Sequence, residues 1–114
     1  ERPETKHLIS DRELKLMKKS PYIVNSARGP IIDEKAMVRA LQNKEIAGAG
    51  LDVYENEPQI EKELFQMENV VLAPHLGSAG KDVREAMAQR VVDNIEALID
   101  GKTPPNCVNP ETLK

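Results

Sequence analysis

Four side chains in the sequence have the types needed to bind an anion and to move a proton: Arg28, Asp52, Glu57 and His75. The planar guanidinium of an arginine matches a carboxylate through two parallel hydrogen bonds. An imidazole exchanges a proton near neutral pH, and a neighbouring carboxylate stabilises its charged form and fixes its tautomer. A keto-acid or hydroxy-acid reaction needs this set, because one group must bind the substrate carboxylate and another must exchange a proton with the C2 oxygen.

Each of these side chains also has an ordinary structural explanation. A loop arginine before a glycine is usually a surface residue, a glutamate before a proline is usually solvated, and a histidine after a strand is usually structural. Their shared position favours a site, because each lies at or after the end of a segment expected to form a strand. In open α/β sheets, ligands bind outside the carboxyl ends of the strands. Spacing alone leaves both explanations open.

The elements that would position these residues alternate in the order typical of a parallel α/β sheet. Ser10 and Glu13 form a capping box that predicts the start of a helix, and Pro21 predicts its end. Strands are expected at residues 22–25, 46–53 and 70–73, and helices at 34–43 and 79–100. The polar stretch 54–66 is expected to hold a single helical turn, and residues 102–114 are expected to be extended.

Apolar spacing predicts which faces are buried. The unbroken run at 70–73 is typical of a strand buried on both faces. Gly48 and Gly50, inside a strand, indicate close approach of another backbone or a ligand. The two main helices each have an apolar stripe, formed by Ala36, Met37, Ala40 and Leu41 in one and by Val83, Met87, Val91, Ile95 and Leu98 in the other.

Side chains and a glycine at the helix ends predict where these helices begin and end. Asp33 and Ser78 are the expected N-caps, and Gly101 is expected directly after the end of the second helix. These three assignments follow from the residue types that satisfy unpaired backbone groups at helix termini.

Composition excludes several classes of protein. The 114 residues are 39% hydrophobic and 31% charged, with net charge -3, which suits one small globular segment with an aliphatic core. The absence of a basic stripe argues against nucleic acid as a partner. The single cysteine, Cys107, excludes an intrachain disulfide, and no metal-ligand spacing occurs. Apolar runs too short for a membrane and an acidic first segment lead us to expect a cytoplasmic protein.

Three long motifs resemble the D-2-hydroxyacid dehydrogenase family in the family's order and spacing. Residues 25–34 resemble its N-x-A-R-G…D-E segment, residues 46–58 its I-A-G-A-x-L-D-V-[FY]-x-x-E-P segment, and residues 69–79 its N-V-x-x-x-P-H-x-G-[GS] segment. The stretch at 3–9 is similar to the P-E-T-x-x-L-I stretch that precedes them. The resemblance covers nearly the whole chain and implies the C-terminal half of a Rossmann-type NAD(P)-binding domain, followed by a long helix and an extended tail.

The resemblance implies a role for each matched residue. Arg28 would bind the substrate carboxylate and keto oxygen, His75 would be the acid/base, and Glu57 would hydrogen-bond to His75. Four residues would contact the nicotinamide of NAD or NADP: Ala27, Asp52, Gly77 and Ser78. Glu55 matches a variable position of the family and is left out of the site, and His7 is expected to be solvated.

The resemblance also implies what the chain lacks. No G-x-G-x-x-G turn occurs, so the pyrophosphate-binding part and most of the substrate domain would lie upstream. Residues 1–100 would then be a partial NAD(P)-binding domain, and residues 101–114 a tail returning toward the substrate domain. The parent would be a homodimeric reductase of a small 2-keto acid, most similar to glyoxylate/hydroxypyruvate reductases, with phosphoglycerate dehydrogenases close behind.

Two alternatives stay open at this point. Corepressors of the C-terminal-binding-protein type share the fold and the three residues, so a non-enzymatic, NAD-sensing binding module is one alternative. An inactive isolated fragment is the other.

Overall fold

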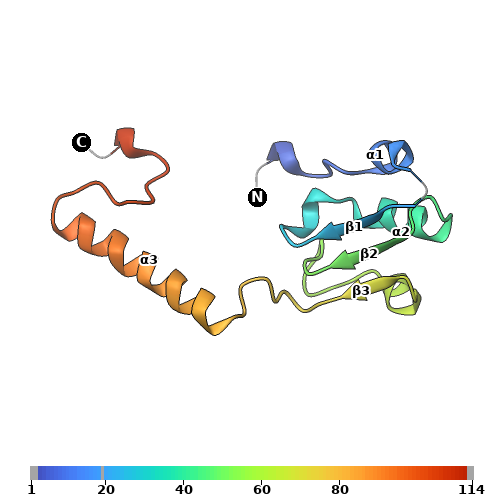
Figure 1. The fold of residues 1–114 in the computed structure, drawn as a ribbon. Helices are drawn as coiled ribbons and strands as arrows, with labels where there is room; N and C mark the ends of the chain where they lie inside the picture. Colours follow the sequence, from blue (N-terminus) through green and yellow to red (C-terminus); the bar gives the residue numbers. More distant parts are fainter. Residues whose placement is uncertain (1–2, 19, 113–114) are drawn as a thin grey trace. The chain divides into compact units, whose positions relative to one another are not determined.

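The computed structural model describes residues 3–18 and 20–112, which form an α/β fold in two compact units that divide between Gly77 and Ser78 (Figure 1). The first unit contains three strands, β1 (Tyr22–Asn25), β2 (Gly48–Leu51) and β3 (Val70–Leu72), and two helices, α1 (Asp11–Leu16) and α2 (Glu34–Gln42). The second unit contains α3 (Lys81–Ile99). Short 3-10 turns lie at Pro3–Thr5, Gly29–Ile31, Lys62–Gln66 and Pro110–Thr112.

The three strands pair in parallel, in the order β1-β2-β3. Val24 lies opposite Gly50, and Gly50 lies opposite Val71, so the strands end at one common edge. The connection from β1 to β2 runs through α2, whereas the connection from β2 to β3 contains only the turn Lys62–Gln66. The predicted parallel sheet and the single helical turn are both confirmed.

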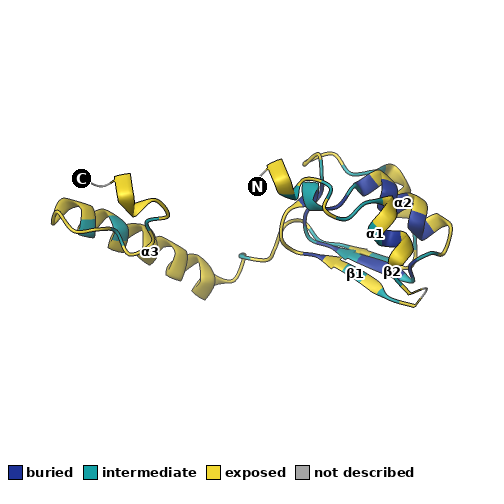
Figure 2. Ribbon diagram, turned by 90° about the horizontal axis from the view of Figure 1, so that it is seen from above, coloured by how far each residue is buried: buried dark blue, intermediate teal, exposed yellow. Residues whose placement is uncertain are grey.

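Helices α1 and α2 cover one face of the sheet and enclose the core (Figure 2). Asp33 caps α2 as predicted, because its side chain accepts a hydrogen bond from the Ala36 N–H at 2.9 Å. The predicted buried stripe of α2 is confirmed, and the largest fully buried side chains of the core are Leu14, Met37, Ile46 and Leu64. A rigid aliphatic base thus supports the strand ends.

The opposite face of the sheet is open among the described residues of the first unit. Side chains alternate along a strand, so Val70 and Leu72 pack on the core while Val71 points away and is 71% exposed. Tyr22 and Val24 are exposed for the same reason, at 70% and 73%. The expectation that residues 70–73 are buried on both faces is therefore wrong within the first unit, because no described residue of that unit covers the second face.

Only one of the two strand glycines marks a close approach. A Cβ at Gly48 would lie 2.4 Å from the Asn69 carbonyl oxygen, which confirms the prediction there. A Cβ at Gly50 would meet nothing nearer than Val24, at an ordinary 3.7 Å, so the prediction for Gly50 is wrong.

The second unit consists of α3 and the tail. Gly80, not Ser78, is the N-cap of α3, and no side-chain hydrogen bond caps the helix, so the predicted capping role of Ser78 is wrong. The other end agrees with prediction, since Gly101 has φ 68° and its N–H donates to Leu98, while the N–H of Lys102 donates to Ala97. These two bonds form a Schellman motif, which requires a left-handed residue at Gly101.

The apolar stripe of α3 is exposed rather than buried, with values from 40% at Val83 to 59% at Leu98. Periodicity identifies a face but not what covers it, and nothing in the described part of this unit covers this one. The tail is not wholly extended. The Asn94 side chain donates a hydrogen bond to Asn106 Oδ1 and accepts one from the Asn106 N–H, each at 3.0 Å. No helix among the described residues is long and apolar enough to cross a membrane.

Candidate active site

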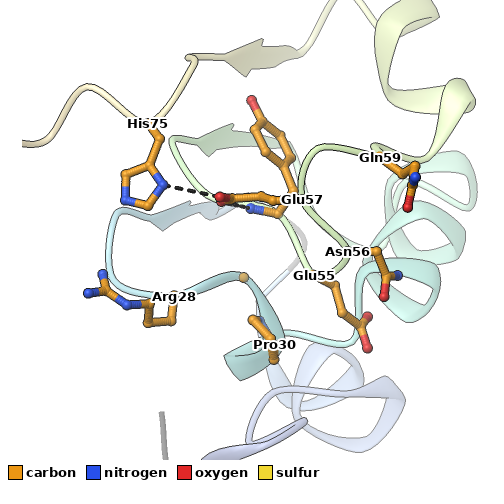
Figure 3. Close-up of a pocket in the computed structure, with 9 residues that line it drawn as sticks. Arg28, Pro30, Glu55, Asn56, Glu57, Gln59 and His75 are labelled. Atoms are coloured by element: carbon orange, nitrogen blue, oxygen red, sulfur yellow. Dashed lines mark hydrogen bonds and ion pairs between the residues drawn. The ribbon is translucent and has the colours of Figure 1, made fainter.

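A hollow of about 460 Å³ lies at the edge where the parallel strands end (Figure 3). Arg28, Glu57 and His75 line it together, although 47 positions separate the first from the last in sequence. The residues that complete its wall come from the same two loops after β1 and β2: Gly29, Pro30, Tyr54, Glu55, Asn56 and Gln59. The prediction that these three side chains lie together at one edge of the sheet is confirmed.

Glu57 and His75 form a pair, with 3.2 Å between Glu57 Oε2 and His75 Nδ1. The other carboxylate oxygen of Glu57 accepts a hydrogen bond from the Tyr54 N–H at 3.0 Å. That backbone bond, the bond to His75 and the nearby charge of Arg28 lower the pKa of Glu57 below its ordinary value. Glu57 is therefore ionised at neutral pH and accepts a hydrogen bond from the Nδ1–H of His75. The other ring nitrogen, Nε2, is then left to exchange a proton.

A buried asparagine holds the Arg28 loop. Asn25 is 6% exposed, accepts a hydrogen bond from the Ala27 N–H at 3.2 Å and donates one to the Arg28 carbonyl at 3.0 Å. The guanidinium of Arg28 donates to the Ala27 carbonyl at 2.6 Å, so the side chain lies against its own loop. The backbone at Arg28 is thus fixed while its side chain is exposed and can be drawn toward an anion.

Glycine is required beside Arg28 by the packing of the two loops. A Cβ at Gly29 would lie 1.8 Å from the Tyr54 carbonyl oxygen. Only glycine allows this approach, and the approach brings the loop that carries Arg28 onto the loop that carries Glu57.

Asp52, directly after β2, connects the end of β1 with the loop that follows β3. Its carboxylate accepts hydrogen bonds from the N–H groups of Leu76 and Gly77 at 2.6 and 2.7 Å, and its own N–H donates to the Asn25 carbonyl at 2.9 Å. His75, which precedes these two N–H groups, has φ 58°, in the left-handed region that few non-glycine residues adopt. The bonds to Asp52 fix the peptide units that follow the imidazole.

The remaining expected site residues divide between the two units. Ala27 and Gly77 lie at the same edge as Asp52, whereas Ser78 begins the second unit and is described with it. No cluster that could hold a metal ion occurs among the described residues.

The expectations for His7 and Glu55 need correction. His7 Nε2 lies 2.6 Å from Glu55 Oε1, so His7 is paired rather than merely solvated, and Glu55 lines the hollow. The sequence analysis also missed the structural roles of Asn25 and Glu34. The side chain of Glu34 is buried, at 5% exposure. An asparagine at a strand end was the available signal for the first, whereas a glutamate in the first turn of a helix ordinarily indicates only a favourable helix start.

A parallel sheet with polar side chains gathered at its carboxyl edge is the arrangement of a Rossmann-type domain. The sequence model of one protein family, the D-isomer specific 2-hydroxyacid dehydrogenase NAD-binding domain, matches residues 1–77. The chain belongs to that family.

Relatives with curated names agree with this assignment. The chain is 50% identical over 110 residues to glyoxylate reductase of Thermococcus litoralis, a match that covers 96% of this chain and 33% of that protein. It is 46% identical over 112 residues to glyoxylate/hydroxypyruvate reductase B of Enterobacter agglomerans, covering 97% and 35%. The chain thus spans about a third of the length of the curated relatives it matches.

A solved structure gives the same result. The NADPH-dependent glyoxylate/hydroxypyruvate reductase of Sinorhizobium meliloti, in complex with NADP and malonate, superposes with a TM-score of 0.82 at 42% identity. The superposition covers 86% of this chain and 31% of that one.

Proposed function

We propose that the whole protein containing this chain is an NAD(P)-dependent reductase of small 2-keto acids of the glyoxylate or hydroxypyruvate type. The observation that carries the proposal is the His75–Glu57 pair at 3.2 Å, in a hollow that Arg28 also lines. The family and the reductases named above support an enzyme rather than a corepressor-type binding module.

Each of the three residues has a distinct role in this reaction. Arg28 leaves the Ala27 carbonyl and binds the substrate carboxylate and keto oxygen, because a charged bidentate acceptor outweighs one neutral carbonyl. Protonated His75 donates the Nε2 proton to the C2 oxygen, and Glu57 balances the charge of the imidazolium. A bound nicotinamide supplies the hydride for C2. The keto acid, NAD(P)H and one proton thus yield the 2-hydroxy acid and NAD(P)+.

The residues present fit the nicotinamide end of the cofactor. A nicotinamide carboxamide offers two N–H donors, and a carboxylate has about four acceptor positions. Asp52 uses two of its positions on Leu76 and Gly77, so acceptor capacity remains, and the Ala27 carbonyl lies at the same edge. Gly77 presents no side chain. We propose Ala27, Asp52, Gly77 and Ser78 as the contacts to NAD or NADP.

The organisation of the whole protein is part of the same proposal. Residues 1–100 belong to the NAD(P)-binding domain, and residues 101–114 return toward a substrate domain. The protein is a cytoplasmic homodimer with no nucleic-acid or membrane partner.

The experiment compares two substrates that differ only in the carboxylate proposed to bind Arg28. The whole protein is mixed with NADH or NADPH and with hydroxypyruvate or hydroxyacetone, in which a methyl group replaces the carboxylate, and cofactor absorbance is followed. We expect rapid oxidation of the cofactor when hydroxypyruvate is the substrate. With hydroxyacetone, kcat/KM should be at least about 100-fold lower. Equal rates for both substrates, or no oxidation with any 2-keto acid, contradict the proposal.

Two variants separate the roles. Arg28→Ala should mainly raise KM for hydroxypyruvate and should affect hydroxyacetone, which keeps only the keto oxygen, much less. His75→Ala should lower kcat by about 10²–10⁴-fold with either substrate. Full activity in one variant removes that residue from the mechanism.

A further inference from the structure

The loop that carries Glu57 is anchored on a buried carboxylate outside the hollow. Glu34, in the first turn of α2, is 5% exposed. Its Oε2 accepts a hydrogen bond from the Glu55 N–H at 2.9 Å, and its Oε1 accepts one from the Glu61 N–H at 2.9 Å. One carboxylate therefore fixes the backbone on both sides of Glu57.

Glu55 returns the contact. Its Oε2 accepts a hydrogen bond from the Glu34 N–H at 3.2 Å, so each of these two residues binds the backbone of the other through its side chain. The second oxygen of Glu55 lies 2.6 Å from His7 Nε2, and the His7 N–H donates to the Pro30 carbonyl at 2.8 Å. Both ends of the Glu57 loop, the start of α2 and the segment at His7 are thus joined in one network.

The burial of Glu34 indicates more than a favourable helix start. An acidic side chain in a first turn stabilises the helix from an exposed position, where it retains its water. Burying a carboxylate costs free energy unless hydrogen bonds replace that water, and the two N–H groups of the Glu57 loop are the replacements here. Glu34 is therefore placed to fix this loop.

We propose that Glu34 is a positioning residue for the Glu57–His75 pair, which acts through the backbone at Glu55 and Glu61. The inference deepens the proposed function and rests on it for its kinetic test. Without Glu34, the segment that carries Glu57 loses its anchor on both sides, and the 3.2 Å contact with His75 is populated for less of the time. Turnover falls, while binding of the substrate carboxylate, which belongs to the loop after β1, is retained.

A double-mutant cycle in the whole protein tests this role. Glu34→Ala and Glu34→Gln are each made in the wild type and in Glu57→Gln, and kcat and KM for hydroxypyruvate are measured. Gln keeps a single acceptor oxygen, so it preserves at most one of the two backbone bonds. Glu63→Ala is the matched control, because it removes a carboxylate of the same charge from an exposed position in the neighbouring turn Lys62–Gln66.

We expect Glu34→Ala to lower kcat about tenfold in the wild type and less than about twofold in Glu57→Gln, with KM little changed. Glu34→Gln should give an intermediate loss in the wild type and retain enough structure to measure if the alanine variant does not fold. Glu63→Ala should match the wild type. An equal loss of kcat in both backgrounds overturns the proposal, because it identifies general damage to the fold.

A measurement that needs neither substrate nor turnover separates this inference from the proposed function. The His75 ring resonances are titrated with pH by NMR in the wild type, Glu34→Gln and Glu57→Gln. We expect the midpoint in Glu34→Gln to move from the wild-type value toward that of Glu57→Gln. If the wild type reduces no 2-keto acid, the proposed function fails and this titration still decides the role of Glu34. An unmoved midpoint in Glu34→Gln overturns the inference even if the enzyme is active.

Discussion

Gly29 packs directly on the backbone of Tyr54, where a Cβ would lie 1.8 Å from the Tyr54 carbonyl oxygen. The contact sets the separation between the loop of Arg28 and the loop of Glu57. Gly29→Ala must push these loops apart, since neither backbone can yield without moving its strand end. We expect kcat/KM to fall about 10²-fold and stability to fall by about 1–3 kcal/mol.

Steady-state kinetics and urea unfolding of the whole protein check this prediction. Gly50→Ala is the matched control, because a Cβ there would make only ordinary contacts of 3.7 Å with Val24. Equal effects of the two substitutions would show that the Gly29 contact has no special importance.

A second prediction concerns pH. The pKa of Glu57 is lowered, chiefly by the hydrogen bond from the Tyr54 N–H and then by His75, so the carboxylate keeps its charge as pH falls below the ordinary range of a glutamate. The stabilisation that the charge of Glu57 gives to the pair is therefore complete above that range. It is lost as pH falls through the lowered pKa.

Glu57→Gln removes this charge, so the imidazole loses its proton at lower pH and the basic limb of the reduction profile moves down. We also expect kcat at neutral pH to fall about tenfold. Rates of NADH oxidation between pH 5 and 9 give the profile. A basic limb at the same pH in both proteins would show that the pair has no influence on proton transfer.

Asp52 gives a third prediction. Asp52→Ala removes both acceptors from the Leu76 and Gly77 N–H groups, so the left-handed backbone at His75 loses its support. We expect a loss of about 1–2 kcal/mol of stability and a lower kcat, with Asp52→Asn intermediate because its amide oxygen replaces one acceptor. Thermal unfolding and kinetics measure the two effects, and equal behaviour of the two variants would argue against the role of these bonds.

The fourth prediction concerns the 114-residue chain by itself. Its sequence contains no G-x-G-x-x-G turn, the element that anchors the pyrophosphate of a dinucleotide at a helix N-terminus. Only contacts at the nicotinamide end are left, so we expect no turnover and no NADH binding at micromolar concentrations. Titration of the purified chain with NADH, followed by fluorescence, checks this, and saturation in the micromolar range would contradict it.

The sequence predicted the elements whose causes are local. The capping box at Ser10, the N-cap at Asp33 and the glycine at 101 specify helix ends through neighbouring residues, and the alternation of strands and helices specified a parallel sheet. The positions of Arg28, Glu57 and His75 followed from that sheet, because residues after parallel strands meet at one edge. The family motifs named the same three residues.

The predictions that were incomplete or wrong depend on distant contacts. The partners of Glu34 are 21 and 27 positions away, and 48 positions separate His7 from Glu55, so no local pattern reveals either network. The exposed stripe of α3 is the reverse case. Its periodicity is local and correct, but burial requires a second surface that the pattern does not describe.

The parallel pairing of the strands also determines when the site is assembled. Parallel strands contact each other only across long connections, so their pairing is non-local and forms late relative to the helices. Arg28, Glu57 and His75 each follow a different strand, and none of the three meets another before the strands have paired. A ribosome must therefore release the chain past β3 and the following loop before the contact between Glu57 and His75 exists, which means that the partly synthesised protein lacks a complete site.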